Sequence, residues 1–115
     1  MSDAPILQGI NRTDDLETAD DFHLKHTPFI ECQRNGDVCT LTVSVGHYVP
    51  HPNQADHWFE YIELYAAGVS IARFEFAAGV VSPEVTCAVM LDPGTELTAM
   101  ASCNLHGVWA ADITT

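Results

Sequence analysis

The sequence predicts an all-β fold, an immunoglobulin-like antiparallel β-sandwich of about seven strands. Short segments rich in β-branched and aromatic residues recur along the chain from Phe29 onward. Turn residues separate these segments at intervals of roughly 8–12 residues, which is the spacing typical of sandwiches. No stretch shows a convincing amphipathic helical period, so we expect sheet to pack against sheet.

The first predicted hairpin contains the strand Val38–Val45, in which apolar and polar residues alternate. The dipeptide Asn35-Gly36 is a strong hairpin signal and predicts a two-residue turn at these positions. That turn would place Cys32 directly opposite Cys39 in a hydrogen-bonded pair. The wider Cα spacing of such a pair makes a disulfide less natural, so we expect two reduced thiols.

Turn chemistry also separates the later strands. Ala67-Gly68 predicts a hairpin turn, and Asp92-Pro93-Gly94 combines the fixed φ of proline with a glycine that tolerates positive φ. We expect strands over His57–Tyr65, Val69–Phe76, Val85–Leu91, Glu96–Ser102 and Val108–Ile113.

The first 24 residues differ in composition from the rest, because they are polar and acidic. We therefore predict an acidic N-terminal arm over residues 1–24 and a single folded domain over residues 25–115. The arm is expected to hold a short helical turn or to dock loosely on the domain.

Net charge limits the partners of this 115-residue chain, which has a formal charge of −12 and four basic residues. Nucleic acid is not an expected partner, because phosphate binding needs clustered lysine and arginine. No apolar run reaches the roughly 18–20 residues that cross a bilayer, so no membrane association is expected. The N-terminus lacks the pattern of a secretory signal, and we expect a cytoplasmic location.

Five side chains have the chemistry of a metal site. Cys103 and His106 stand three residues apart, and His26 precedes Thr27-Pro28. His51 lies in the loop His47–Asp56, which holds two prolines and an asparagine, and His57 directly follows it. Four imidazoles and one thiolate exceed the four ligands of a closed zinc site by one. Imidazole suits iron, copper, nickel and zinc, and five ligands leave an octahedral ion one open position.

Three stretches in family order carry a resemblance to the iron domain of the superoxide reductases, the neelaredoxin/desulfoferrodoxin group. They are KHTPFIE (25–31), VGHYVPHPNQADHWFEYIELYAAG (45–68) and CNLHGVW (103–109). The resemblance implies the sandwich fold and one iron per chain. It also implies four equatorial ligands, His26, His51, His57 and His106, with Cys103 as the axial ligand.

The resemblance further implies the activity: one-electron reduction of superoxide to hydrogen peroxide at a mononuclear non-haem iron, a detoxification reaction. A small electron carrier such as rubredoxin would reduce the iron again, and members of this class often form homotetramers. Some members carry an additional rubredoxin-like module with four cysteines. This sequence lacks the paired cysteines for one, so it resembles the single-iron class.

Two residues beside His26 modify this expectation. By resemblance, Lys25 attracts superoxide to the open face of the iron, which matters in so acidic a chain. Many members have glutamate at the position of Leu24, where it can occupy the sixth iron position after oxidation. Leucine cannot ligate, so water, hydroxide or an outside anion is expected there, or a carboxylate from Asp20 or Asp21.

The remaining histidines, His23 and His47, fall outside the matched ligand positions and are expected at the surface or behind the ligands. Two other functions remain open from the residues. The same iron centre could serve as a non-catalytic redox sensor or electron-transfer module, or the ligands could hold a structural zinc on a β-sandwich. Visible colour separates iron from zinc, and turnover of superoxide separates an enzyme from a sensor.

Overall fold

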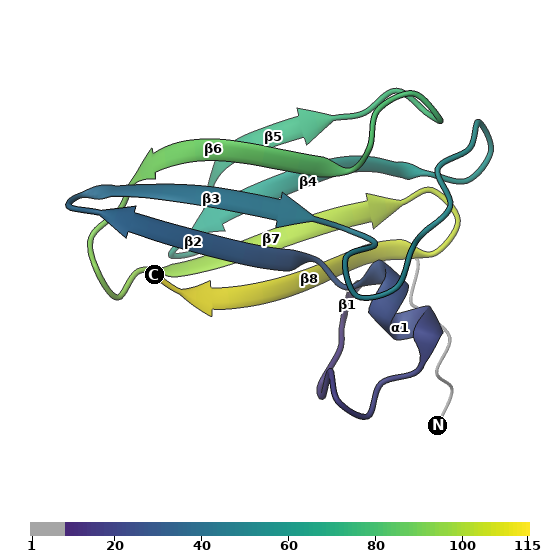
Figure 1. Ribbon diagram of the computed structural model, residues 1–115, viewed down its shortest axis with the longest axis horizontal. Helices are drawn as coiled ribbons and strands as arrows, with labels where there is room; N and C mark the ends of the chain where they lie inside the picture. Colours follow the sequence, from purple (N-terminus) through teal and green to yellow (C-terminus); the bar gives the residue numbers. More distant parts are fainter. Residues whose placement is uncertain (1–8) are drawn as a thin grey trace.

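The computed structural model describes residues 9–115, which form a sandwich of two β-sheets (Figure 1). A five-stranded sheet has the order β1-β8-β7-β4-β5, and a three-stranded sheet has the order β2-β3-β6. The elements are β1 (Ile10–Arg12), α1 (Asp21–His26), β2 (Phe29–Asn35), β3 (Val38–Ser44), β4 (Phe59–Ala66), β5 (Val69–Glu75), β6 (Glu84–Met90), β7 (Glu96–Cys103) and β8 (Gly107–Thr114). The predicted all-β sandwich is confirmed, with an eighth short strand, β1, in addition to the predicted seven.

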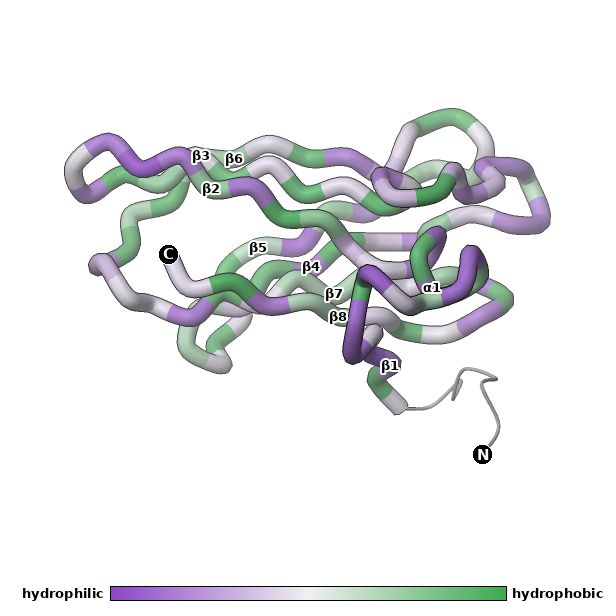
Figure 2. Tube along the Cα trace, turned by 60° about the horizontal axis from the view of Figure 1, so that its bottom comes forward, coloured by the Kyte–Doolittle hydropathy of each residue, from purple (hydrophilic) through white to green (hydrophobic). Residues whose placement is uncertain are grey.

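The core lies between the sheets and follows from alternation along the strands, which change between hydrophobic and hydrophilic residues (Figure 2). In β3, Cys39, Leu41 and Val43 point inward and are at most 1% exposed. Ile62 and Leu64 of β4 meet them from the opposite sheet and are fully buried. Full burial of one such aliphatic side chain contributes about 1.5–3 kcal/mol.

The β2–β3 hairpin differs from the prediction by one position. Asn35 pairs with Val38, so the two-residue turn is Gly36-Asp37 and not Asn35-Gly36. Gly36 has a φ of +64°, whereas Asn35 has no positive φ and stays in the strand. A glycine at the first turn position is the preference of a type II′ turn, which needs only one residue with positive φ there.

This shift in register separates the two cysteines of the hairpin. Cys32 pairs with Leu41, and Cys39 pairs with Arg34, so the predicted direct pairing of Cys32 with Cys39 is wrong. The two side chains still share the inner face of the sheet as diagonal neighbours. All four cysteines, which lie within residues 9–115, are free thiols in the structure.

Strand β1 and helix α1 fasten the N-terminal region to the large sheet. β1 pairs in parallel with β8, and the Asn11 side-chain amide donates to the Val108 carbonyl oxygen at 3.0 Å. Asp20 caps α1, because its Oδ1 accepts from the His23 backbone N–H at 2.9 Å. The predicted division of the chain falls inside α1, between Leu24 and Lys25, and it stays a prediction.

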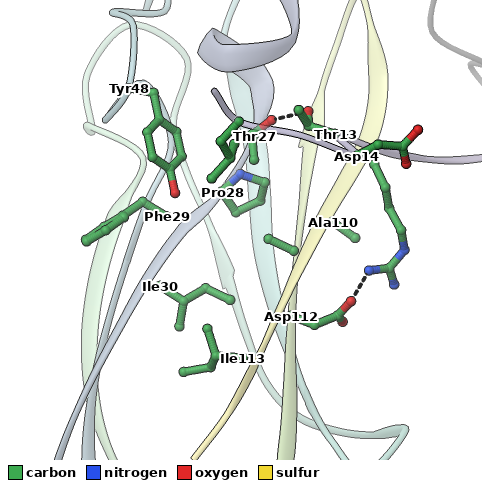
Figure 3. A pocket seen from close by; sticks show the side chains of 13 residues that line it. Thr13, Asp14, Thr27, Pro28, Phe29, Ile30, Tyr48, Ala110, Asp112 and Ile113 are labelled. Carbon is green, nitrogen blue, oxygen red and sulfur yellow. Dashed lines mark hydrogen bonds and ion pairs between the residues drawn. The ribbon is translucent and has the colours of Figure 1, made fainter. Parts of the chain in front are cut away.

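A groove of about 620 Å³ lies beside these N-terminal contacts (Figure 3). The Thr13–Thr27 hydroxyl pair and the Arg12–Asp112 ion pair lie along it. Its lining contains no histidine and no cysteine, so the groove is separate from the predicted metal ligands. Within residues 9–115, no helix has the length and apolar content that a membrane crossing requires.

Candidate metal centre

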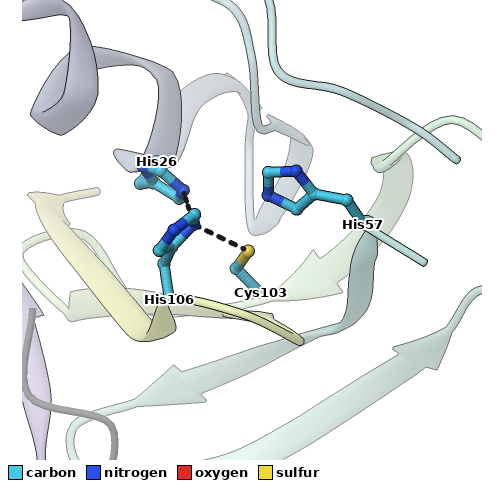
Figure 4. A group of neighbouring side chains, drawn as sticks. All are labelled: His26, His57, Cys103 and His106. Carbon is cyan, nitrogen blue, oxygen red and sulfur yellow. Dashed lines mark hydrogen bonds between the residues drawn. The ribbon is translucent and has the colours of Figure 1, made fainter.

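The five predicted ligands lie in different parts of the fold. His26 ends α1, His51 and His57 lie in the connection between β3 and β4, Cys103 ends β7, and His106 lies in the turn before β8. These segments meet at one end of the sandwich, and Figure 4 shows His26, His57, Cys103 and His106 directed toward one another.

The ligand atoms are close enough to share one ion. One nitrogen each from His26, His57 and His106 and the Cys103 sulfur all lie within 4.8 Å of one another. The fifth residue, His51, adds a nitrogen, because its Nε2 lies 3.6 Å from the Cys103 Sγ. The structure therefore brings together all five residues that the sequence singled out.

The four imidazoles form a closed ring in the order His26, His51, His57, His106. Neighbouring ring centroids are separated by 4.8, 4.7, 5.2 and 5.0 Å around this circuit. Neighbouring rings are inclined by 68–79°. Cys103 Sγ lies 3.6 Å from His51 Nε2 and 3.7 Å from His106 Nδ1. Four imidazoles in T-shaped contact and one adjacent sulfur therefore gather four nitrogen donors and one sulfur donor in one place.

Backbone carbonyls determine which nitrogen His26 and His51 present. His26 Nδ1 lies 2.6 Å from the Phe22 carbonyl oxygen, and His51 Nδ1 lies 2.6 Å from that of Pro52. A carbonyl oxygen only accepts, so both Nδ1 atoms carry hydrogen. Each Nε2 therefore keeps its lone pair for an ion, the arrangement typical of metal-binding histidines.

The other two histidines also fit a bound ion. His57 Nε2 is buried and has no hydrogen-bond partner among the described residues. Such an orphan atom is costly unless something binds it. His106 turns Nδ1 toward the cluster, 3.2 Å from His26 Nε2. The nitrogen and thiolate donors together suit a transition metal and not a hard cation such as magnesium.

Burial favours the neutral form of His26, His51 and His106. Burial lowers the pKa of His26 to about 4 and that of His51 to about 3, and it also lowers the pKa of His106. Neutral imidazole is the form that binds a metal. Burial raises the pKa of the Cys103 thiol, whereas backbone N–H groups of Leu105 and His106 donate to the sulfur and oppose this rise. A cation beside Cys103 would favour the thiolate.

Metal-free protein should lose stability in mild acid. The unfolded chain takes up protons on histidine near pH 6.5, whereas folded His26 and His51 resist until about pH 4 and 3. The free energy of unfolding is therefore greatest above pH 6.5, and at pH 5 it is lower by roughly 2–4 kcal/mol. Urea unfolding of chelator-treated protein at several pH values measures this slope.

Two variants make that experiment specific. His51→Gln should flatten the pH dependence, because it removes one of the two histidines whose pKa is strongly lowered. His47→Gln should leave it unchanged, since His47 is exposed and stacks on Phe29 at 3.7 Å between ring centroids, apart from the cluster. An unfolding free energy that stays constant between pH 7 and 5 would contradict the expectation.

Several residues that the sequence did not single out hold the ligands in place. Trp109 is 1% exposed, stacks on His26 at 5.0 Å between centroids, and donates from Nε1 to the His106 carbonyl oxygen at 3.0 Å. Phe22 contacts His26 at 4.6 Å and His106 at 5.0 Å between ring centroids. The available signal for Phe22 was its position four residues before His26, on the same face of a short helix. Trp109 lies in the stretch 103–109 that carried the family resemblance.

Asn104 joins the two ligand-bearing loops. Its Oδ1 accepts from the Trp58 backbone N–H at 2.9 Å, and its Nδ2 donates to the Asp56 carbonyl oxygen at 2.9 Å. The Cys103–His106 turn is therefore fixed to the segment that carries His57.

The residues beside the ligands have distinct positions. Lys25 is half-buried, and its charge contributes to lowering the pKa of His26 and His106, so its ammonium group acts on the cluster. His23 lies against Trp109, with 5.5 Å between ring centroids, and its Nδ1 lies 2.6 Å from Asp20 Oδ1. The Asp20 carboxylate is engaged in this contact and in the helix cap, and Leu24 offers no donor atom.

Comparison with known proteins agrees with this geometry. The Desulfoferrodoxin family model matches residues 18–112. The chain is 34% identical over 109 residues to the superoxide reductase of Pyrococcus furiosus, covering 78% of this chain and 87% of that protein. It is 39% identical over 95 residues to the desulfoferrodoxin of Nitratidesulfovibrio vulgaris, covering 83% of this chain and 68% of that protein.

Solved structures give the same result. The superoxide reductase (neelaredoxin) of Ignicoccus hospitalis has a TM-score of 0.76 and 35% identity, covering 91% of this chain and 92% of that chain. The neelaredoxin of Archaeoglobus fulgidus in its reduced form has a TM-score of 0.75 and 31% identity, covering 91% of this chain and 96% of that chain. Sequence, fold and the family match over most of the chain agree, and the protein belongs to the desulfoferrodoxin family.

Proposed function

We propose that this protein is a superoxide reductase that converts superoxide to hydrogen peroxide at one iron per chain. The imidazoles of His26, His51, His57 and His106 and the thiolate of Cys103 would hold the iron. The observation that carries the proposal is the closed ring of four imidazoles in contact with one thiol sulfur. The family membership supports it, because relatives of this chain are superoxide reductases.

Iron, when bound, supplies the single electron by changing between its ferrous and ferric states. Reduction of one superoxide to hydrogen peroxide consumes this electron and two protons, and it releases no dioxygen. The Cys103 thiolate would be an electron-rich ligand to this iron, as a thiolate is in haem enzymes. Hydrogen bonds from the backbone N–H groups of Leu105 and His106 moderate its electron donation.

Lys25 is expected to offset the repulsion between this acidic protein and superoxide. Superoxide is an anion, and a protein with a net charge of −12 repels it at long range. At 0.1 M salt this repulsion is screened beyond about 10 Å, so the charges nearest the site decide the approach. The charge of Lys25 contributes to lowering the pKa of His26 and His106, and we expect its ammonium group to attract the substrate.

The proposed reaction also needs an electron donor. A small electron carrier such as rubredoxin would restore the ferrous state after each turnover. The family resemblance supports assembly of several copies, for which a homotetramer is the expected form. We also propose a cytoplasmic location and an acidic arm over residues 1–24 that precedes the iron domain.

Metal analysis and superoxide turnover test the function together. Anaerobically purified protein should contain about one iron per chain and should develop visible absorption on oxidation, which a d¹⁰ zinc site cannot do. With pulses of superoxide and a reductant, it should form peroxide in a 1:1 ratio to superoxide consumed. Formation of dioxygen, or a single turnover without reduction of the iron by any donor, would contradict the proposal and favour a sensor.

Replacement of Lys25 by alanine should slow the reaction with superoxide without loss of iron. The second-order rate constant should fall by roughly three- to tenfold at low ionic strength, and its dependence on salt should weaken. Pulse radiolysis at several salt concentrations measures both effects.

Two controls separate charge from structure. Lys25→Arg keeps the positive charge and should react at nearly the wild-type rate. Arg73→Ala removes a cation that pairs with Glu63 on the outer face of β4 and β5, and it should have little effect. If Lys25→Ala and Arg73→Ala change the rate and its salt dependence equally, the steering role of Lys25 is wrong.

A further inference from the structure

A β-bulge in β4 lies directly beside the cysteine of the cluster. Phe59 pairs with Cys103 and Tyr61 pairs with Ser102, so Glu60 is an extra residue without a partner across the strand pair. A bulge of this kind redirects a side chain and is common beside active sites. It departs from the alternation of β4, in which Ile62 and Leu64 face the core.

The bulge holds the Glu60 carboxylate beside the strand end that carries the sulfur. The Ser102 hydroxyl donates to Glu60 Oε1 at 3.1 Å. Ser102 is only 7% exposed. Ser102 directly precedes Cys103 in the chain. The backbone of Glu60 is also fixed, because its carbonyl oxygen accepts from the Phe76 N–H at 2.9 Å.

No cation in the described part of the chain forms an ion pair with this carboxylate. Arg73, the arginine of the adjacent strand β5, pairs with Glu63 instead and lies 3.7 Å from the centroid of the Tyr61 ring. Glu60 therefore presents an uncompensated negative charge in a half-buried position.

We propose that Glu60 is a positioning residue that lowers the reduction potential of the iron centre through the Cys103 thiolate. This inference rests on the proposed function for the identity of the metal. A fixed anion stabilises ferric iron more than ferrous iron, because the ferric state carries one more positive charge. Net charge and hydrogen bonding near the sulfur are the levers by which a protein tunes such a centre. Glu60 supplies the charge, and the bulge supplies its fixed position.

The reduction potential of iron-loaded Glu60→Gln tests this directly. Glutamine has nearly the same size and can still accept from the Ser102 hydroxyl, so the change removes charge and preserves packing. The equilibrium constant for reduction should rise about three- to tenfold, which is roughly 30–60 mV for one electron. A redox titration followed by visible absorption, without superoxide, measures the change.

Two variants identify the cause. Glu60→Asp keeps the negative charge and should restore most of the wild-type potential. Glu63→Gln removes a carboxylate from the same strand, but one that pairs across to Met100 and is engaged by Ser70 and Arg73. It should shift the equilibrium constant less than twofold. An unchanged potential in Glu60→Gln, or an equal shift in Glu63→Gln, would overturn the inference.

This test is independent of turnover. A raised potential in Glu60→Gln supports the role of Glu60 even if the wild-type protein fails to reduce superoxide, which would overturn only the proposed function. Superoxide turnover together with equal potentials in Glu60→Gln and wild type would overturn only the role of Glu60.

Discussion

Cys103→Ser should abolish the visible absorption band of the oxidised protein and lower superoxide turnover by a factor on the order of 100. A serine hydroxyl remains protonated under conditions in which a metal-bound thiol is deprotonated, and it is a poor electron donor. The side chain changes little in size at a site only 2% exposed, so the fold should persist. Absorption spectra and stopped-flow rates measure the two effects, and iron content shows whether the metal is still bound.

Cys87→Ser is the matched control, because Cys87 lies in β6 opposite Leu41 and away from the cluster. That variant should keep the band, the iron and the rate. A visible band that survives in Cys103→Ser would show that the sulfur is not bound to the metal, and the assignment of the cysteine would be wrong.

Trp109→Ala should cause the largest loss of stability among single substitutions near the site. The indole is the largest of the fully buried side chains, and removing such a group costs about 3–5 kcal/mol of unfolding free energy. The same change removes the surface on which His26 stacks and the donor to the His106 carbonyl. Metal affinity should therefore fall together with stability.

Denaturant unfolding of the metal-free and metal-loaded forms separates these two effects. Trp109→Phe keeps an aromatic face against His26 but loses the N–H donor, so it should lie between wild type and Trp109→Ala in both measurements. A loss of less than about 1 kcal/mol in metal-free Trp109→Ala would contradict the proposed packing role.

The sequence was sufficient to predict the seven main strands, because each carries its own alternation or is bounded by its own turn. It was insufficient for β1, which has three residues and pairs in parallel with a strand almost the whole chain away. A strand this short has no period to detect. The predicted register of the β2–β3 hairpin was wrong for a different reason. Asn35-Gly36 fits one turn type and Gly36-Asp37 fits another, and the local sequence does not decide between them.

For the candidate site, the sequence identified which side chains gather but not how they face one another. The order of the rings and the nitrogen that each presents depend on backbone groups, such as the Phe22 and Pro52 carbonyls, that only the folded chain positions. The bulge at Glu60 was equally hidden, because a single inserted residue changes no motif. Motifs therefore specify the chemical groups, and the fold specifies their orientation.

The ligands come from separate parts of the chain, and this origin has a mechanical consequence. His26 ends the short helix α1, whereas His106 lies 80 residues later, between the last two strands. An ion bound to both ends of that span acts as a cross-link, and it restricts the unfolded chain in the way that closing a long loop does. α1 has only six residues and would be marginal alone. Loading the metal should therefore add a second attachment of the N-terminal region to that made by β1 and β8, and amide exchange in α1 should report occupancy of the site.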